Sequence, residues 1–117
     1  MQVGVDVGGS LTKVAIVTEG DRQFRLLEYT DAGRVSEALP LGVPIHATGC
    51  GATELLKRLG SRVTVQDELE CFCVGARQLA QEQGMGSHPF VLTSMGTGTS
   101  VFRVTGESGA SAGTRAD

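Results

Sequence analysis

Apolar, β-branched and aromatic residues form three short runs in the first thirty residues of the chain. Valine occupies every second position from residue 3 to residue 7, and the other two runs are residues 14–18 (VAIVT) and 24–29 (FRLLEY). A turn signal, Glu-Gly-Asp at residues 19–21, separates the second run from the third. The pattern therefore predicts three strands joined as a meander.

From residue 31 onward, short apolar runs alternate with stretches of helical spacing. The pattern predicts strands over residues 43–47, 62–66, 90–93 and 100–104, and helices over residues 31–39, 53–59 and 67–83. In the last helix the apolar residues share one face: Leu69, Phe72, Cys73, Ala76, Leu79 and Ala80. Pro40 ends the first helix, and Gly60 is a plausible C-cap for the second. Three strands followed by alternating strands and helices describe the first half of a two-domain α/β architecture.

The end of the chain differs from the rest in composition. Residues 107–117 (ESGASAGTRAD) have almost no apolar side chains and cannot bury a core face. We therefore expect residues 1–104 to form one lobe. We expect residues 105–117 to be a tail, either disordered or marking the point where the chain departs from the frame of a longer protein.

Composition limits the classes of function. The 117 residues suffice for a modest globular domain, and 40% apolar with 20% charged residues fits a soluble protein. The net charge of −3 and the absence of a basic cluster give no argument for nucleic acid as a partner. No apolar segment approaches the length of a membrane span, so we expect a cytoplasmic protein with no membrane partner. The three cysteines, at positions 50, 71 and 73, are expected to be free thiols.

The first turn of the meander carries residues that suit a phosphate group. Asp6 lies near the end of the first predicted strand, and Gly8 and Gly9 lack the Cβ atoms that would keep a polyanion away from the backbone N–H groups. Polar and cationic side chains follow at Ser10, Thr12 and Lys13. A carboxylate at a strand end can hold Mg²⁺ through its waters, which makes Asp6 the candidate metal ligand. The same residues also fit an ordinary tight hairpin, and the spacing matches neither a P-loop nor a dinucleotide fingerprint.

A second glycine-rich bend lies between two predicted strands. Residues 94–100 read Ser-Met-Gly-Thr-Gly-Thr-Ser, with glycines at Gly96 and Gly98. Two hairpins of glycine and hydroxyl residues can face each other across a cleft and hold the phosphates of a nucleotide and the acceptor group. Hydroxyls and backbone N–H groups would supply neutral hydrogen bonds there, and Lys13 would supply charge.

Acidic residues gather at the start of the helix predicted over residues 67–83. Asp67 fits an N-cap and Glu70 fits the capping-box position, so both have a structural interpretation. Glu68 fills neither of these positions. A carboxylate at a helix start near a phosphate site could accept a proton from a substrate hydroxyl during phosphoryl transfer. Glu68 is therefore the candidate catalytic base.

Four ordered segments, VGVDVGGSLTKVAIV, ATGCGA, VQDELECFCVGARQL and FVLTSMGTGTSVFRV, resemble the type II (eukaryotic-like) pantothenate kinases. The similarity runs from about residue 2 to about residue 104. This family belongs to the acetate and sugar kinase/Hsp70/actin superfamily. The resemblance implies a ribonuclease H-like (actin-like ATPase) N-terminal lobe with a mixed sheet, followed by an incomplete second lobe. It also implies ATP- and Mg²⁺-dependent phosphorylation of pantothenate to 4'-phosphopantothenate, the first step of coenzyme A synthesis, by a homodimer.

The resemblance also implies roles for single residues. Glu68 matches the catalytic base of the family, whereas Thr97 and Ser100 match hydroxyl positions that contact pantothenate or the acyl-CoA inhibitor. The first phosphate motif of the family is matched by Asp6, Gly8, Gly9, Ser10 and Lys13. Family members continue with a substrate arginine, a further glycine-rich motif and a C-terminal domain. We therefore expect this 117-residue form to be truncated, with little kinase activity.

Two other functions remain open at this stage. The first phosphate hairpin is shared widely within the superfamily, so the chain could belong to a sugar or N-acetylhexosamine kinase. Alternatively, it could be a regulatory fragment that has lost catalysis and binds acyl-CoA or pairs with a full-length subunit.

Overall fold

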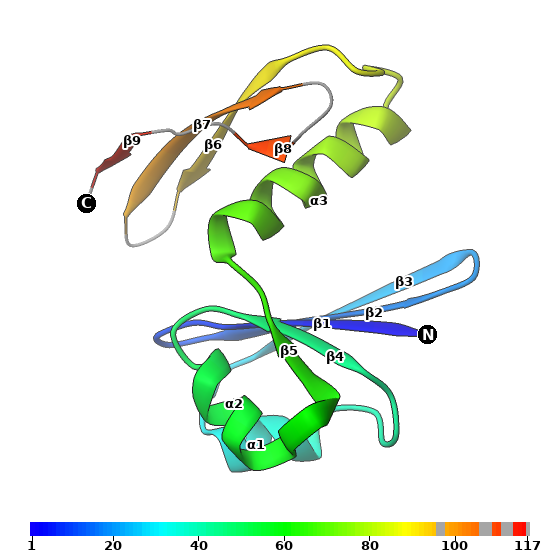
Figure 1. The fold of residues 1–117 in the computed structure, drawn as a ribbon, viewed down its shortest axis with the longest axis vertical. Helices are drawn as coiled ribbons and strands as arrows, with labels where there is room; N and C mark the ends of the chain where they lie inside the picture. Colours follow the sequence, from blue (N-terminus) through cyan, green and yellow to red (C-terminus); the bar gives the residue numbers. More distant parts are fainter. Residues whose placement is uncertain (96–97, 106–108, 111–113, 117) are drawn as a thin grey trace. The chain divides into compact units, whose positions relative to one another are not determined.

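The computed structural model describes residues 1–95, 98–105, 109–110 and 114–116 (Figure 1). The chain divides into two compact units, Met1–Asp67 and Glu68–Asp117, and each is described by itself. The lobe over residues 1–104 and the tail over residues 105–117 stay predictions. Two short strands, β8 (Gly109–Ala110) and β9 (Thr114–Ala116), lie within the segment expected to be a tail.

The first unit is built on a five-stranded mixed sheet with the order β3-β2-β1-β4-β5. Its strands are β1 (Gln2–Val7), β2 (Thr12–Thr18), β3 (Asp21–Leu27), β4 (Ile45–Thr48) and β5 (Val63–Val65). The first three strands pair antiparallel, which confirms the predicted meander. β4 pairs parallel with β1, and β5 pairs parallel with β4. The carboxyl ends of β1, β4 and β5 therefore lie at one edge of the sheet.

Helices α1 (Ala32–Glu37) and α2 (Ala52–Leu59) lie on the same side of this sheet (Figure 1). The Asp31 carboxylate accepts a hydrogen bond from the Arg34 backbone N–H at 3.1 Å and so caps α1. α2 ends at Gly60, whose φ of 66° confirms the predicted cap, and a short 3₁₀ turn (Gly60–Arg62) leads into β5. The alternate valines of β1 and Leu55 of α2 belong to the core beneath the helices.

The second unit packs helix α3 (Glu68–Glu82) against an antiparallel sheet. β6 (Phe90–Met95) pairs with β7 (Thr99–Thr105), and β7 also pairs with β8 and β9. Among the described residues its core is small: Cys73, Phe102 and Val104 are buried, with Phe90 and Leu92 packed against them. Of the residues on the predicted apolar face of this helix, Cys73 and Ala80 are buried, whereas Leu69 and Leu79 are exposed.

Arg77 connects α3 to the rest of this unit. Its guanidinium donates hydrogen bonds to the carbonyls of Gly86 and His88, in the connection that leads to β6, and to that of Thr105 at the end of β7. The same group stacks on the Phe90 ring, 4.7 Å from its centroid. One side chain thus fixes both ends of the β6–β7 hairpin to the helix. None of the helices in the described part of the chain has the length and apolar content needed to span a membrane.

Candidate functional site

The first glycine turn joins β1 to β2 over residues 8–11. The Gly8 N–H donates a hydrogen bond to the Leu11 carbonyl at 2.9 Å. A Cβ atom on Gly8 would lie 2.9 Å from this same oxygen, so the turn itself excludes a side chain there. At Gly9, by contrast, no atom of the described chain lies within 4 Å of the Cβ position. Gly8 is therefore needed for the turn, whereas Gly9 is exposed and has free space at its Cβ position.

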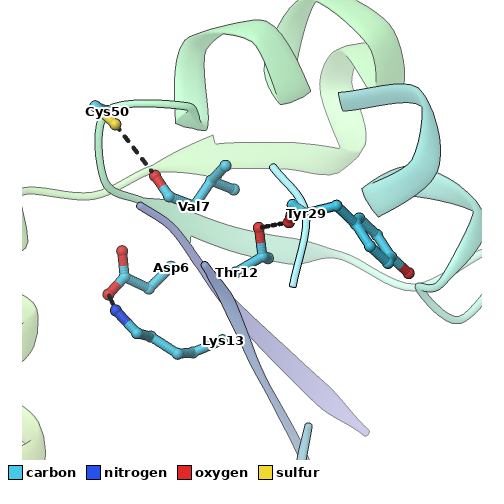
Figure 2. A network of polar contacts seen from close by, with 6 residues as sticks. All are labelled: Asp6, Val7, Thr12, Lys13, Tyr29 and Cys50. Atoms are coloured by element: carbon cyan, nitrogen blue, oxygen red, sulfur yellow. Dashed lines mark hydrogen bonds and ion pairs between the residues drawn. The ribbon is translucent and has the colours of Figure 1, made fainter. Parts of the chain in front are cut away.

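Asp6 and Lys13 face each other across the strands that flank this turn. They are direct partners in the antiparallel register, and Lys13 Nζ lies 3.6 Å from Asp6 Oδ2 (Figure 2). The Asp6 side chain is 23% exposed and the Lys13 side chain is 57% exposed. An ion pair of this exposure contributes roughly 0–1 kcal/mol to stability. Its importance lies in placing one cation and one carboxylate at the base of the glycine turn, with Lys13 Nζ 3.9 Å from the Cβ position of Gly8.

Thr12 lies on the opposite face of the same hairpin. Its side chain is 0% exposed, and its hydroxyl donates a 2.8 Å hydrogen bond to the Tyr29 carbonyl (Figure 2). Because successive residues of a strand point to opposite faces, Thr12 shares the core face with Val7, away from Asp6 and Lys13. The prediction that Thr12 contacts the nucleotide stays a prediction. Ser10 lies exposed in the turn with Gly9.

The loop between β4 and α2, residues 49–51, contacts the end of β1, and sequence reasoning assigned it no role. Asp6 pairs with Thr48 in the parallel register, so the two strands end together. The Val7 carbonyl accepts hydrogen bonds from the Gly51 N–H at 3.0 Å and from the Cys50 thiol at 3.7 Å (Figure 2). The available signal was a Gly-x-Gly sequence directly after a buried strand, which permits this close backbone approach.

The second glycine bend and Glu68 belong to the other unit. Register pairs Ser94 with Ser100, which confirms an antiparallel hairpin at this position. Gly96 and Thr97 lie outside the described residues. Gly98 is half-buried, and Ser100 is 5% exposed and engaged with a partner.

Glu68 is the first residue of α3, as predicted, and its side chain is half-buried. Asp67 directly precedes the helix, at the position expected for the N-cap. The structure thus brings Asp6, Lys13, Gly8 and Gly9 together within the first unit. It places Glu68 and Ser100 in the second unit.

The fold is that of the actin-like ATPases. A Sinorhizobium meliloti protein described as a 2-dehydro-3-deoxygalactonokinase matches 98% of this chain and 54% of its own, at 12% identity and a TM-score of 0.58. The Aquifex aeolicus Ppx/GppA phosphatase matches 97% of this chain and 50% of its own, at 13% identity and a TM-score of 0.55. YeaZ from Pseudomonas aeruginosa matches 99% of this chain and 67% of its own, at 14% identity and a TM-score of 0.52. These similarities establish the architecture.

Sequence comparison identifies the group of proteins that the chain resembles: type II pantothenate kinases. The enzyme of this name from Bacillus thuringiensis subsp. konkukian is 30% identical over 108 residues, 87% of this chain and 39% of its own. The one from Oceanobacillus iheyensis is 31% identical over 105 residues, 86% of this chain and 40% of its own. The chain therefore spans about two fifths of the length of these relatives. No protein-family model matches it.

Proposed function

We propose that this chain carries the phosphate-binding turn and the catalytic base of a kinase that phosphorylates pantothenate with ATP. The observation that carries the proposal is the glycine turn between β1 and β2, with Gly9 exposed in it and the Asp6–Lys13 pair on the strands that flank it. Backbone N–H groups and an adjacent lysine are the donors that a polyphosphate requires. The similarity to pantothenate kinases over most of the chain supports pantothenate as the acceptor.

The reaction would be an in-line displacement at the γ-phosphate of ATP. The pantothenate hydroxyl oxygen forms a bond to the γ-phosphorus while the bond to the leaving ADP oxygen breaks. Glu68 accepts the hydroxyl proton, and Lys13 offsets the negative charge of the phosphates. The hydroxyls of Thr97 and Ser100 are proposed to contact pantothenate. Gly96 and Gly98 are proposed to let backbone approach the phosphates.

Asp6 is the residue proposed to hold Mg²⁺. Its carboxylate is partly exposed, and oxygen ligands are those that this ion prefers. No group of three or more His, Cys, Asp or Glu side chains in the described part of the chain could hold a metal ion. A magnesium site at Asp6 would thus need water and phosphate oxygens as its other ligands. When bound, the ion would neutralise phosphate charge.

The remaining assignments come from the resemblance. Acyl-CoA as an inhibitor, a homodimeric assembly and a cytoplasmic location are proposed on that ground. The domain arrangement, with residues 1–104 as an actin-like lobe, is proposed with them.

Gly8 and Gly9 give a matched pair of variants for the phosphate site. Gly9→Ala adds a methyl group where the chain leaves open space, so we expect normal stability and a loss of MgATP affinity of at least tenfold. Gly8→Ala meets the Leu11 carbonyl, so we expect a lower melting temperature. Isothermal titration with MgATP and thermal unfolding are the two measurements. MgATP affinity unchanged in Gly9→Ala would remove this turn from the nucleotide site.

Glu68 is tested by its amide analogue. The variant is made in a version extended by the C-terminal part that the longer relatives carry. There Glu68→Gln keeps the shape of the side chain but cannot accept the proton, so we expect kcat for pantothenate phosphorylation to fall by about 10²- to 10⁴-fold. MgATP affinity should stay within threefold of the parent, because the carboxylate is not assigned to nucleotide binding. Turnover close to that of the parent would exclude Glu68 as the base.

A second candidate function is phosphorylation of a sugar derivative. The shared fold with a protein described as a sugar-acid kinase is the observation that favours it. A substrate panel distinguishes the two functions. ATP-dependent phosphorylation of a hexosamine or a sugar acid, with pantothenate inert, would replace our proposal with this alternative.

A further inference from the structure

The loop after β4 leaves no room for a side chain next to the Asp6 carboxylate. Gly49 has a φ of +91°, a conformation that favours glycine. A Cβ atom placed on it would lie 2.6 Å from Asp6 Oδ1 and would also collide with the Val7 carbonyl. Both the backbone conformation and the contact with β1 therefore require glycine at this position.

The two oxygens of Asp6 thus have different neighbours. Oδ1 occupies space that a side chain at Gly49 would take, while Oδ2 lies 3.6 Å from Lys13 Nζ. Figure 2 shows the carboxylate and the lysine pointing toward each other, with Cys50 on the loop nearby. Lys13 therefore contacts one oxygen of the carboxylate, and the missing side chain of Gly49 leaves space for the other.

The contact between this loop and β1 is fixed by further interactions. The Val7 carbonyl is bound by the Gly51 N–H and the Cys50 thiol. Directly before the loop, the Thr48 hydroxyl donates a 2.8 Å hydrogen bond to the Gln66 carbonyl. Gly51 is itself pressed against the Val7 side chain, with no space for a Cβ atom. The loop therefore holds Gly49 at a set distance from Asp6.

We propose that Gly49 is a positioning residue, which sets the orientation of the Asp6 carboxylate for a magnesium ion bound with nucleotide phosphates. This inference rests on the proposed function. Its physical basis is steric: a side chain at position 49 would push Oδ1 away and change the direction in which the carboxylate presents its lone pairs. Residues that orient a metal ligand typically change metal affinity by about 10- to 100-fold when altered.

The test compares Gly49→Ala with Gly51→Ala in the 117-residue chain. Gly51→Ala is the control. Its added methyl group meets the Val7 side chain instead of the Asp6 carboxylate, so it crowds the end of β1 without touching the proposed metal ligand. Mg²⁺ is titrated at fixed ADP, and the apparent magnesium affinity is measured alongside the melting temperature. We expect both variants to melt earlier, and only Gly49→Ala to lose about 10- to 100-fold in magnesium affinity. Equal losses in the two variants would overturn the proposal.

A double-mutant cycle separates this proposal from the metal assignment itself. In an Asp6→Ala background there is no carboxylate to orient, so adding Gly49→Ala should leave magnesium affinity unchanged. If Gly49→Ala lowers magnesium affinity as much in the Asp6→Ala background as in the parent chain, the positioning role is overturned. Asp6→Ala alone leaving magnesium affinity intact would instead contradict the proposed function.

Asp6→Glu keeps the test decisive if Gly49→Ala does not fold. The longer side chain retains the charge but moves the oxygens away from the position next to Gly49. We expect it to lose at least tenfold in magnesium affinity, whereas affinity within threefold of the parent would overturn the proposal.

Discussion

At the scale of single residues, neighbours on β2 have opposite environments. Thr12 is buried on the core face and bonded to the Tyr29 carbonyl, whereas Lys13 faces outward toward Asp6. Both are polar and both follow the glycine turn, so their residue types suggest the same role. The strand period separates them.

Thr12→Val provides a direct test of that difference. The substitution keeps the shape of the side chain but leaves the Tyr29 carbonyl without its partner, which should lower the free energy of unfolding by roughly 1–3 kcal/mol. Thr12→Ser retains the hydroxyl and is the control for the hydrogen bond. Urea unfolding and MgATP titration are the measurements, and we expect nucleotide affinity to be unchanged in Thr12→Val. Full stability combined with lost MgATP affinity would instead show that the hydroxyl contacts the nucleotide.

At the scale of elements, α2 joins the core to the loop that contacts β1. It begins at Ala52, directly after Gly51, and its Leu55 is 0% exposed within the core of the first unit. Leu56, one position further, is 36% exposed. Packing of α2 through Leu55 therefore supports the loop that carries Gly49.

These adjacent leucines form a matched pair of variants. Leu55→Ala should lower the free energy of unfolding by about 2–5 kcal/mol, because it removes buried methyl groups and leaves a cavity. Leu56→Ala should cost about 1 kcal/mol or less, since its side chain already contacts water. Chemical denaturation of both variants measures the difference. Equal costs would show that α2 does not pack as described.

At the scale of the whole molecule, the two units differ in how much apolar surface they bury. The core of the first unit contains twelve buried residues, and that of the second contains three in the described part of the chain. Arg77 adds carbonyl contacts to the second unit but no apolar core, and its Nε atom is buried with no partner among the described residues.

Hydrogen exchange should therefore protect the first unit more strongly. Backbone N–H groups of β1, β4 and α2 are expected to exchange more slowly than those of β6 and β7, because local opening costs more where more contacts are lost. Exchange measured by mass spectrometry on the intact chain gives both values in one experiment. Equal protection in the two units would contradict the difference in core size.

The sequence predicted the elements well and the environment of the site residues less well. Alternating valines and the Glu-Gly-Asp turn predicted the meander, because strand period and turn chemistry are local properties. Local patterns do not state which glycine the turn needs. In the structure, a side chain at Gly8 would collide with the Leu11 carbonyl, whereas one at Gly9 would meet no atom of the described chain. Helical spacing placed Leu69 and Leu79 on the apolar face of α3, but it does not say how much of that face is covered, and both side chains are exposed.

The sequence by itself determined the order and type of the elements from β1 to β7, the glycine turn with its acidic and basic neighbours, and the resemblance to a kinase family. The first two depend on residues that are close in the chain, and the resemblance depends on four short segments and their order. The tertiary structure decided that the loop after β4 lies against β1 and limits the Asp6 carboxylate. Parallel pairing brought together residues some forty positions apart in the sequence, such as Asp6 and Thr48, and no local pattern specifies which strands will pair.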